Sequence, residues 1–167
     1  FEEAVTAANK AVFEESASHV EYEGMGTTVV ACTLEENTLY IANIGDSRLY
    51  LIRDGIEQIT DDHPLVEEMV KQGNITESEA RIHPQKNIIT RALGINEEVQ
   101  ADFFEIDVEQ GDVIMLCSDG LSNMIEDEDM EYIVKNSDTL QTAAESLVAR
   151  ANENGGNDNI TVVLAEV

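Results

Sequence analysis

The stretch GDVIMLCSDGLSNMI, residues 111–125, decides the fold together with NDNITVVL at residues 157–164. In each stretch an acidic residue stands at the end of an apolar, strand-like run: Asp119 follows VIMLC, and Asp158 precedes ITVVL. A carboxylate beside a turn-forming residue at a strand end can hold a hard cation, because the rigid strand fixes the oxygen. For either aspartate alone, an ordinary turn is the better interpretation. The two together predict a metal centre built from distant parts of one fold.

The composition is that of a globular but strongly acidic chain. Its 167 residues suffice for one domain with a sizeable core, and 43% of them are hydrophobic. Nine basic and 35 acidic residues give a formal net charge of -26, which argues against nucleic acids and anionic membranes as partners. No run is long and apolar enough to span a membrane. Cys32 and Cys117 lie in apolar runs without a CxxC pattern, so buried thiols and a reducing, cytoplasmic setting are expected.

The order of the predicted elements favours layered α+β structure over an alternating parallel sheet. Strands are predicted at residues 27–33, 38–44, 47–53, 99–108, 112–117 and 160–167. Helices are predicted at residues 1–18, 127–135 and 139–152. Turn residues at 36–37 and 54–55 make an antiparallel meander the simplest pairing of the first three strands.

A polar segment at residues 62–87 interrupts the strands. It contains both prolines and a helical stretch at 65–72, and Thr76-x-x-Glu79 has the pattern of a capping box that opens a second short helix. Such an insertion is often a flap beside a functional site, or it is only an elaborate connection. We expect one domain over residues 1–167, with residues 62–87 as its flap.

Three further features have both a structural and a functional interpretation. Asp46, in the sequence GDSR between two strands, is either a turn residue or a third carboxylate near the same centre, and spacing alone favours the turn. Arg91 either guides an anionic substrate or belongs to a structural ion pair, and neither interpretation is preferred. The three histidines, His63 among them, lack the spacing of a zinc site and are expected on the surface or in the flap.

Six segments, taken in order, resemble the metal-dependent protein phosphatases, the type 2C Ser/Thr phosphatases, and specifically their compact bacterial branch. The segments are GMGTTVV, ANIGDSRLYLIR, ITDDHPLVEEMVKQGNIT, IITRALG, GDVIMLCSDGLSNMI and NDNITVVL. Each is weak alone, but six in order make a strong match. The resemblance implies an αββα sandwich of two antiparallel sheets with helices outside. It also implies hydrolysis of phosphoserine and phosphothreonine in proteins, in opposition to a cognate Ser/Thr kinase.

The same resemblance implies metal-binding roles for three aspartates. Asp119 and Asp158 correspond to ligands of a first core ion, and Asp46 to a ligand of a third, weaker one. The implied cofactors are two core Mn²⁺ or Mg²⁺ ions, with a possible third. The family's N-terminal third, which carries a phosphate-binding arginine and the second-metal ligands, has no counterpart in these segments. We therefore assign no catalytic residue, and expect the C-terminal two-thirds of such an enzyme, inactive alone.

Two alternatives to an active phosphatase remain. The first is a non-catalytic, phosphatase-like domain that binds phosphoproteins, although the retained Asp46, Asp119 and Asp158 count against it. The second is an acidic interaction domain unrelated to metal. A metal effect on the melting temperature would separate the second alternative from the others.

Overall fold

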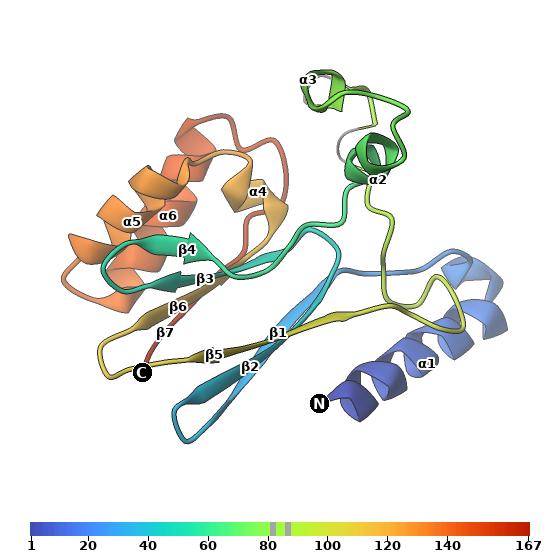
Figure 1. The fold of residues 1–167 in the computed structure, drawn as a ribbon, viewed down its shortest axis with the longest axis horizontal. Helices are drawn as coiled ribbons and strands as arrows, with labels where there is room; N and C mark the ends of the chain where they lie inside the picture. Colours follow the sequence, from blue (N-terminus) through green and yellow to red (C-terminus); the bar gives the residue numbers. More distant parts are fainter. Residues whose placement is uncertain (81–82, 86–87) are drawn as a thin grey trace. The chain divides into compact units, whose positions relative to one another are not determined.

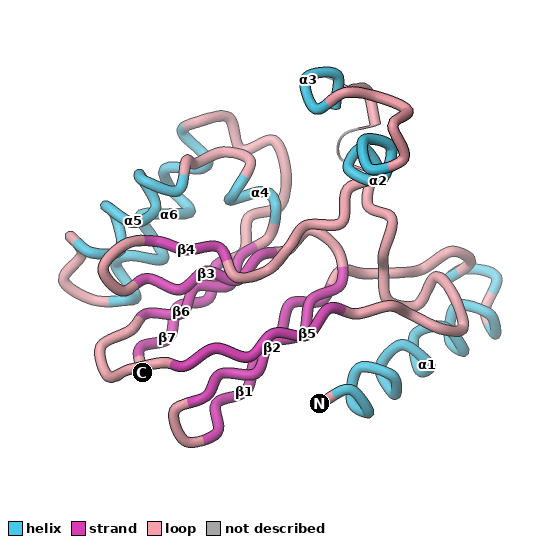
Figure 2. The backbone as a smooth tube through the Cα atoms, viewed as in Figure 1, coloured by secondary structure: helices cyan, strands magenta, loops and turns pink. Residues whose placement is uncertain are grey.

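Helices and two antiparallel sheets make up the computed structural model, which describes residues 1–80, 83–85 and 88–167 (Figures 1 and 2). The strands are β1 (Val29–Glu35), β2 (Thr38–Ile44), β3 (Arg48–Ile52), β4 (Ile56–Gln58), β5 (Asp102–Asp107), β6 (Val113–Cys117) and β7 (Val162–Glu166). The helices are α1 (Glu2–Ser18), the 3₁₀ helix η1 (Val20–Tyr22), α2 (Leu65–Lys71), α3 (Glu77–Ala80), α4 (Asp119–Ser122), α5 (Asp127–Lys135) and α6 (Leu140–Glu153). The expected α+β class is confirmed.

The antiparallel meander expected for the first three strands is wrong at its second connection. The three-stranded sheet has the order β1-β2-β5, whereas β3 lies in a four-stranded sheet of order β4-β3-β6-β7. Gly45 explains the break, because its φ of +106° is a conformation that residues with side chains rarely adopt. A Cβ there would also collide with the side chain of Thr28. The chain therefore leaves the first sheet at Gly45 instead of folding back beside β2.

The described residues form two compact units. The first consists of Phe1–Ala31, Ala42–Asp46 and Asp62–Phe103, and the second of Cys32–Ile41, Ser47–Asp61 and Phe104–Val167. The strands of the three-stranded sheet supply residues to both units. The four-stranded sheet and the helices α4, α5 and α6 belong to the second unit alone.

In the second unit, α4, α5 and α6 cover one face of the four-stranded sheet (Figure 1). Tyr50 of β3 and Met115 of β6, both fully buried, pack in one core with Met130 of α5 and Leu147 of α6. The helices form here because their apolar residues recur on one side: α5 buries Met130 and Val134, which are four residues apart. This core supports the β6 and β7 ends where the two predicted metal ligands stand.

In the first unit, α1 packs against the end of β2. Val5 shares a buried cluster with Ala42 and Ile44. One turn later the buried Asn9 holds the loop before β5: its Nδ2 donates to two backbone carbonyls, at 3.1 and 3.0 Å, and its Oδ1 accepts from the amide of Gly94 at 2.8 Å. The buried side-chain amide of Asn9 thus uses its Nδ2 donors and its Oδ1 acceptor to attach this loop to α1.

The segment expected to be a flap contains α2 and α3, as predicted. The capping box is present, because the amide of Thr76 donates to the Glu79 carboxylate at 2.8 Å and the amide of Glu79 donates to Thr76 Oγ1 at 3.3 Å. The backbone amide and the hydroxyl of Thr76 both donate to the Glu79 carboxylate and lower its pKa. Of the expected flap at 62–87, residues 81–82 and 86–87 lie outside the described residues.

Two expectations from composition can be compared with the structure. Both cysteines are reduced thiols; Cys117 is buried as expected, whereas Cys32, in the partly covered half of β1, is only half-buried. Within the part of the chain that the structure describes, no helix has the length and apolar character needed to cross a membrane.

Candidate metal centre

The segments that carry Asp119 and Asp158 lie against each other within the second unit. The amide of Ser118 donates to the carbonyl of Thr161 at 3.1 Å, and the Thr161 amide donates back to Ser118 Oγ at 3.0 Å. Ser118 Oγ in turn donates to the carbonyl of Asn159 at 2.9 Å. These bonds extend the pairing of β6 and β7 beyond the strand ends. Two segments some forty residues apart are thereby held in one place.

Gly120 allows this close approach. A Cβ at Gly120 would lie 2.9 Å from the carbonyl carbon of Asn159, and closer still to its oxygen, whereas ordinary contact begins at 3.4 Å. The neighbouring atoms belong to the backbone, so they cannot rotate away as a flexible side chain could. Only glycine lets α4 begin directly against residues 158–159.

The two carboxylates offer oxygen atoms, which are the ligands that Mg²⁺ and Mn²⁺ prefer. Asp119 is half-buried at the start of α4, and its Oδ2 accepts from Asn123 Nδ2 at 3.3 Å. Asp158 is exposed, and its Oδ1 accepts from the amide of Asn159 at 2.7 Å, which fixes the direction of the carboxylate. The donor chemistry fits a hard divalent ion.

The number of protein ligands is smaller than a complete site needs. Among the described residues, no group of three or more histidine, cysteine, aspartate or glutamate side chains is placed to hold a metal ion. Asp119 and Asp158 alone would supply only part of a coordination sphere, which water or other groups would have to complete. The third predicted ligand, Asp46, is half-buried and belongs to the first unit.

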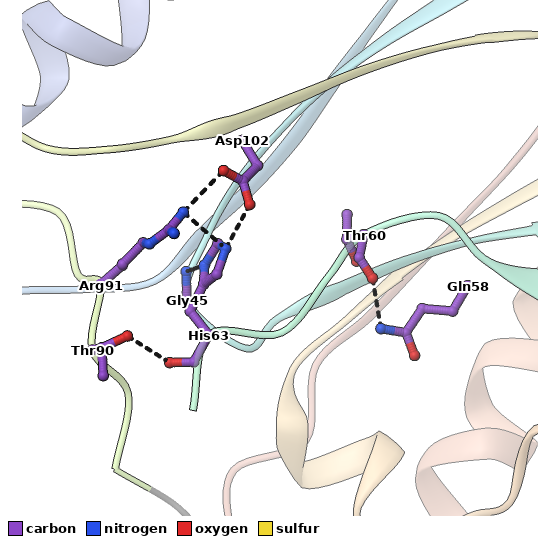
Figure 3. A network of polar contacts seen from close by, with 7 residues as sticks. All are labelled: Gly45, Gln58, Thr60, His63, Thr90, Arg91 and Asp102. Atoms are coloured by element: carbon purple, nitrogen blue, oxygen red, sulfur yellow. Dashed lines mark hydrogen bonds and ion pairs between the residues drawn. The ribbon is translucent and has the colours of Figure 1, made fainter. Parts of the chain in front are cut away.

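A buried histidine holds the residue before Asp46. The Gly45 amide donates to His63 Nδ1 at 3.2 Å, and the His63 amide donates to the carbonyl of Gly45 at 3.1 Å (Figure 3). His63 Nε2 lies 2.7 Å from Asp102 Oδ2. The side chain of His63 is only 7% exposed; of the two expected locations, the surface is therefore wrong, and the residue lies at the start of the 62–87 segment. Burial is tolerated because both ring nitrogens have partners.

Arg91 completes this polar network. Its Nη1 lies 2.9 Å from Asp102 Oδ1 and 3.2 Å from His63 Nε2 (Figure 3). Of the two interpretations of Arg91, the structural ion pair is therefore present. The residue also borders a pocket of about 320 Å³ within the first unit. The pocket is lined by Ile89, Thr90, Arg91, Ala92, Ile95, Asn96, Glu98, Val99 and Gln100.

The charge of Asp102 determines which ring nitrogen of His63 carries the proton. Partial burial raises the pKa of Asp102, but the hydrogen bonds from His63 and Arg91 and the charge of Arg91 outweigh it and hold the pKa below its usual value. Asp102 is thus an ionised acceptor at neutral pH. Because the Gly45 amide donates to Nδ1, the ring proton of His63 is assigned to Nε2, facing Asp102.

The chain belongs to the protein phosphatase 2C family, whose sequence profile matches residues 1–165. It is 43% identical over 159 residues to the serine/threonine phosphatase stp of Listeria monocytogenes, which covers 95% of this chain and 63% of the relative. It is 46% identical over 147 residues to the protein phosphatase PhpP of Streptococcus pneumoniae, which covers 87% of this chain and 60% of the relative. The chain thus spans less than two thirds of the length of these curated relatives.

Solved structures agree with this assignment. The crystal structure of the Mycobacterium tuberculosis serine/threonine phosphatase PstP/Ppp is similar with a TM-score of 0.89 and 40% identity, over 99% of this chain and 70% of that chain. The catalytic domain of PstP in complex with 2 manganese ions is similar with a TM-score of 0.84 and 38% identity, over 98% and 68% of the two chains. The fold expected from the six ordered segments is therefore confirmed.

Proposed function

We propose that the complete protein carrying this chain is a metal-dependent phosphatase that hydrolyses phosphoserine and phosphothreonine in other proteins. The observation that supports it most directly is the convergence of the Asp119 and Asp158 segments, across a glycine, in a chain of the phosphatase 2C family. The names of the relatives point to the same reaction. The substrates would be proteins phosphorylated by a Ser/Thr kinase, in the cytoplasm.

We assign Asp119 and Asp158 as ligands of one core ion, and Asp46 as a ligand of a separate, weaker one. The two manganese ions of the PstP complex support Mn²⁺ as a suitable cofactor, with Mg²⁺ as the chemically similar choice. Such ions, when bound, neutralise charge on phosphoryl oxygens and make a bound water more acidic. The chain's own contribution is to hold the carboxylates: Ser118 and Gly120 set the approach of the two segments. We further assign residues 62–87 as the flap of a single phosphatase domain.

Isosteric substitutions in the complete protein test this proposal. Asp119→Asn and Asp158→Asn each replace a charged ligand with a neutral amide of the same size, so we expect Mn²⁺-dependent hydrolysis of p-nitrophenyl phosphate and of a phosphothreonine peptide to fall on the order of a hundredfold or more. Calorimetric titration with Mn²⁺ should show the loss of a core ion. Asp46→Asn should weaken turnover but spare tight Mn²⁺ binding. Asp138→Asn, at an exposed position between α5 and α6, is the matched control.

Two outcomes would count against the proposal. Wild-type turnover in Asp119→Asn and Asp158→Asn would remove these residues from the metal centre. Binding of the phosphothreonine peptide without hydrolysis at any Mn²⁺ concentration would instead support the non-catalytic, phosphoprotein-binding alternative.

A further inference from the structure

We propose that His63 is a positioning residue: its imidazole ring fixes the Ile44–Gly45 peptide, its backbone amide fixes the Gly45–Asp46 peptide, and Asp102, paired with Arg91, holds the ring from its other side. The inference rests on the proposed function only in taking Asp46 as a metal ligand. It concerns a residue that is not proposed as a ligand of the ions and that acts through the backbone.

His63 controls both peptide groups that flank Gly45. The Gly45 amide belongs to the peptide shared with Ile44, and it donates to the ring at 3.2 Å. The Gly45 carbonyl belongs to the peptide shared with Asp46, and it accepts from the His63 amide at 3.1 Å. Because each peptide group is planar, fixing its amide or its carbonyl fixes its orientation. The direction in which Asp46 leaves the turn is thus set by one residue.

Gly45 needs such external control. Its φ of +106° lies in a region that glycine enters easily but also leaves easily, since no Cβ restricts the backbone. Thr28 closes the space where a side chain could have locked the conformation. Hydrogen bonds from His63 supply the restriction that the glycine itself lacks.

The ring is in turn attached to a rigid element. Asp102 is the first residue of β5, and its Oδ2 lies 2.7 Å from His63 Nε2. Arg91 Nη1 donates to the second carboxylate oxygen of Asp102, Oδ1, at 2.9 Å. The Asp102 side chain therefore has little freedom to turn away. The ionised carboxylate requires the proton on Nε2, which leaves Nδ1 as the acceptor that the Gly45 amide needs. A continuous series of contacts therefore leads from β5 to the turn.

The backbone of His63 also closes the base of the segment expected to be the flap. Its carbonyl accepts from the amide of Thr90 at 2.9 Å and from Thr90 Oγ1 at 3.2 Å, and Pro64 and Ile89 form an antiparallel bridge beside it. These backbone bonds do not depend on the side chain. Substitution of the ring therefore tests its contact with Gly45 without removing the pairing of Thr90 with residue 63.

Two substitutions at His63 separate its two side-chain contacts. In His63→Asn the amide oxygen takes the place of Nδ1, so the bond from Gly45 is kept and the bond to Asp102 is lost. In His63→Gln the longer side chain places its amide NH₂ near Nε2, so the bond to Asp102 is kept and the bond from Gly45 is lost. His63→Ala loses both. His83→Asn is a matched control, because that ring accepts a local amide, that of Gln85.

Two measurements on the complete protein test the effects of these substitutions. Hydrogen exchange of the Gly45 amide, followed by NMR without added metal, should stay slow in wild type and His63→Asn and become fast in His63→Gln and His63→Ala. The Mn²⁺ concentration for half-maximal hydrolysis of p-nitrophenyl phosphate should rise about ten- to a hundredfold in His63→Gln, as in Asp46→Asn. It should change by less than about threefold in His63→Asn, and melting temperatures should show that all variants are folded.

The result that would overturn the inference is equal behaviour of His63→Asn and His63→Gln in both measurements, or a slow-exchanging Gly45 amide in His63→Gln. If His63 were merely structural, the two variants would differ from wild type only in the stability of the folded protein. If Asp46→Asn leaves the Mn²⁺ response unchanged, the metal assignment of Asp46 is wrong. Fast exchange of Gly45 confined to His63→Gln and His63→Ala would still support the positioning role.

Discussion

Gly120→Ala should damage the candidate metal centre without removing any polar group. The new Cβ would lie 2.9 Å from the carbonyl carbon of Asn159, whereas ordinary contact begins at 3.4 Å. The Asn159 oxygen would be closer still, so the two segments must separate by more than the roughly 0.5 Å difference between those distances. Because Asp119 is in one segment and Asp158 in the other, the separation is transmitted to both carboxylates.

The magnitude follows from the sensitivity of catalytic sites to geometry. A misplacement of about 1 Å can cost on the order of a hundredfold in rate, so we expect the kcat of Gly120→Ala to fall about ten- to a hundredfold at saturating Mn²⁺. Overpacking of this kind costs about 1–3 kcal/mol of stability, and the protein should remain folded. The assay is hydrolysis of p-nitrophenyl phosphate over a range of Mn²⁺ concentrations, with urea unfolding measured in parallel.

Gly55→Ala is the matched control for this substitution. Gly55 lies in the turn between β3 and β4, where nothing stands within 4 Å of an added Cβ, so activity and stability should be unchanged within about 0.5 kcal/mol. Wild-type kcat in Gly120→Ala, with an unchanged urea midpoint, would refute the reasoning. It would show that the 118–120 and 158–161 segments can separate without consequence for the reaction.

Two further predictions concern the polar groups that stabilise each unit. Asn9→Ala leaves the buried Gly94 amide without its acceptor, so urea unfolding should show a loss of about 2–3 kcal/mol, while exposed Lys10→Ala should change it little. The hydrogen bond from Arg53 lowers the pKa of Asp112, although burial acts in the opposite direction. Since the pKa in the folded chain is below that of the unfolded chain, this stabilisation is present above about pH 4 and is lost as the pH falls. The melting temperature of Asp112→Asn should therefore fall less steeply than that of wild type between about pH 5 and pH 3; parallel curves would contradict the shift.

Local patterns account for what could be predicted from the sequence. The bounds of β2 and α5 agree with the predicted 38–44 and 127–135, because alternation and helical spacing are properties of neighbouring residues. The Thr76–Glu79 capping box is equally local, since its two partners are three residues apart. Asp119 and Asp158 could be selected because each stands at the end of its own apolar run.

The partition of strands between two sheets could not be derived in the same way. β2 pairs with β5, and β3 pairs with β6; in both pairs the partner strand follows residues 62–87 in the sequence. Strand pairing depends on long-range packing. The two-residue alternation within a strand does not show which other strand it pairs with. The one local signal was Gly45, which marks a positive φ but does not say which sheet the next strand joins. The short strand β4 has too few residues to show a period.

The burial of His63 was not predicted, for a related physical reason. A histidine next to a proline at the start of a polar segment suggests exposure, because burying an imidazole without partners is costly. In the structure the cost is offset by the Gly45 amide and by Asp102, which Arg91 in turn holds, and these residues come from three other segments. Whether a polar side chain can be buried depends on the hydrogen-bond partners that the fold brings to it. The sequence around His63 therefore could not indicate its burial. The same dependence makes the network informative: a ring bonded on both nitrogens, beside a glycine with a positive φ, restrains the turn before Asp46 from outside that turn.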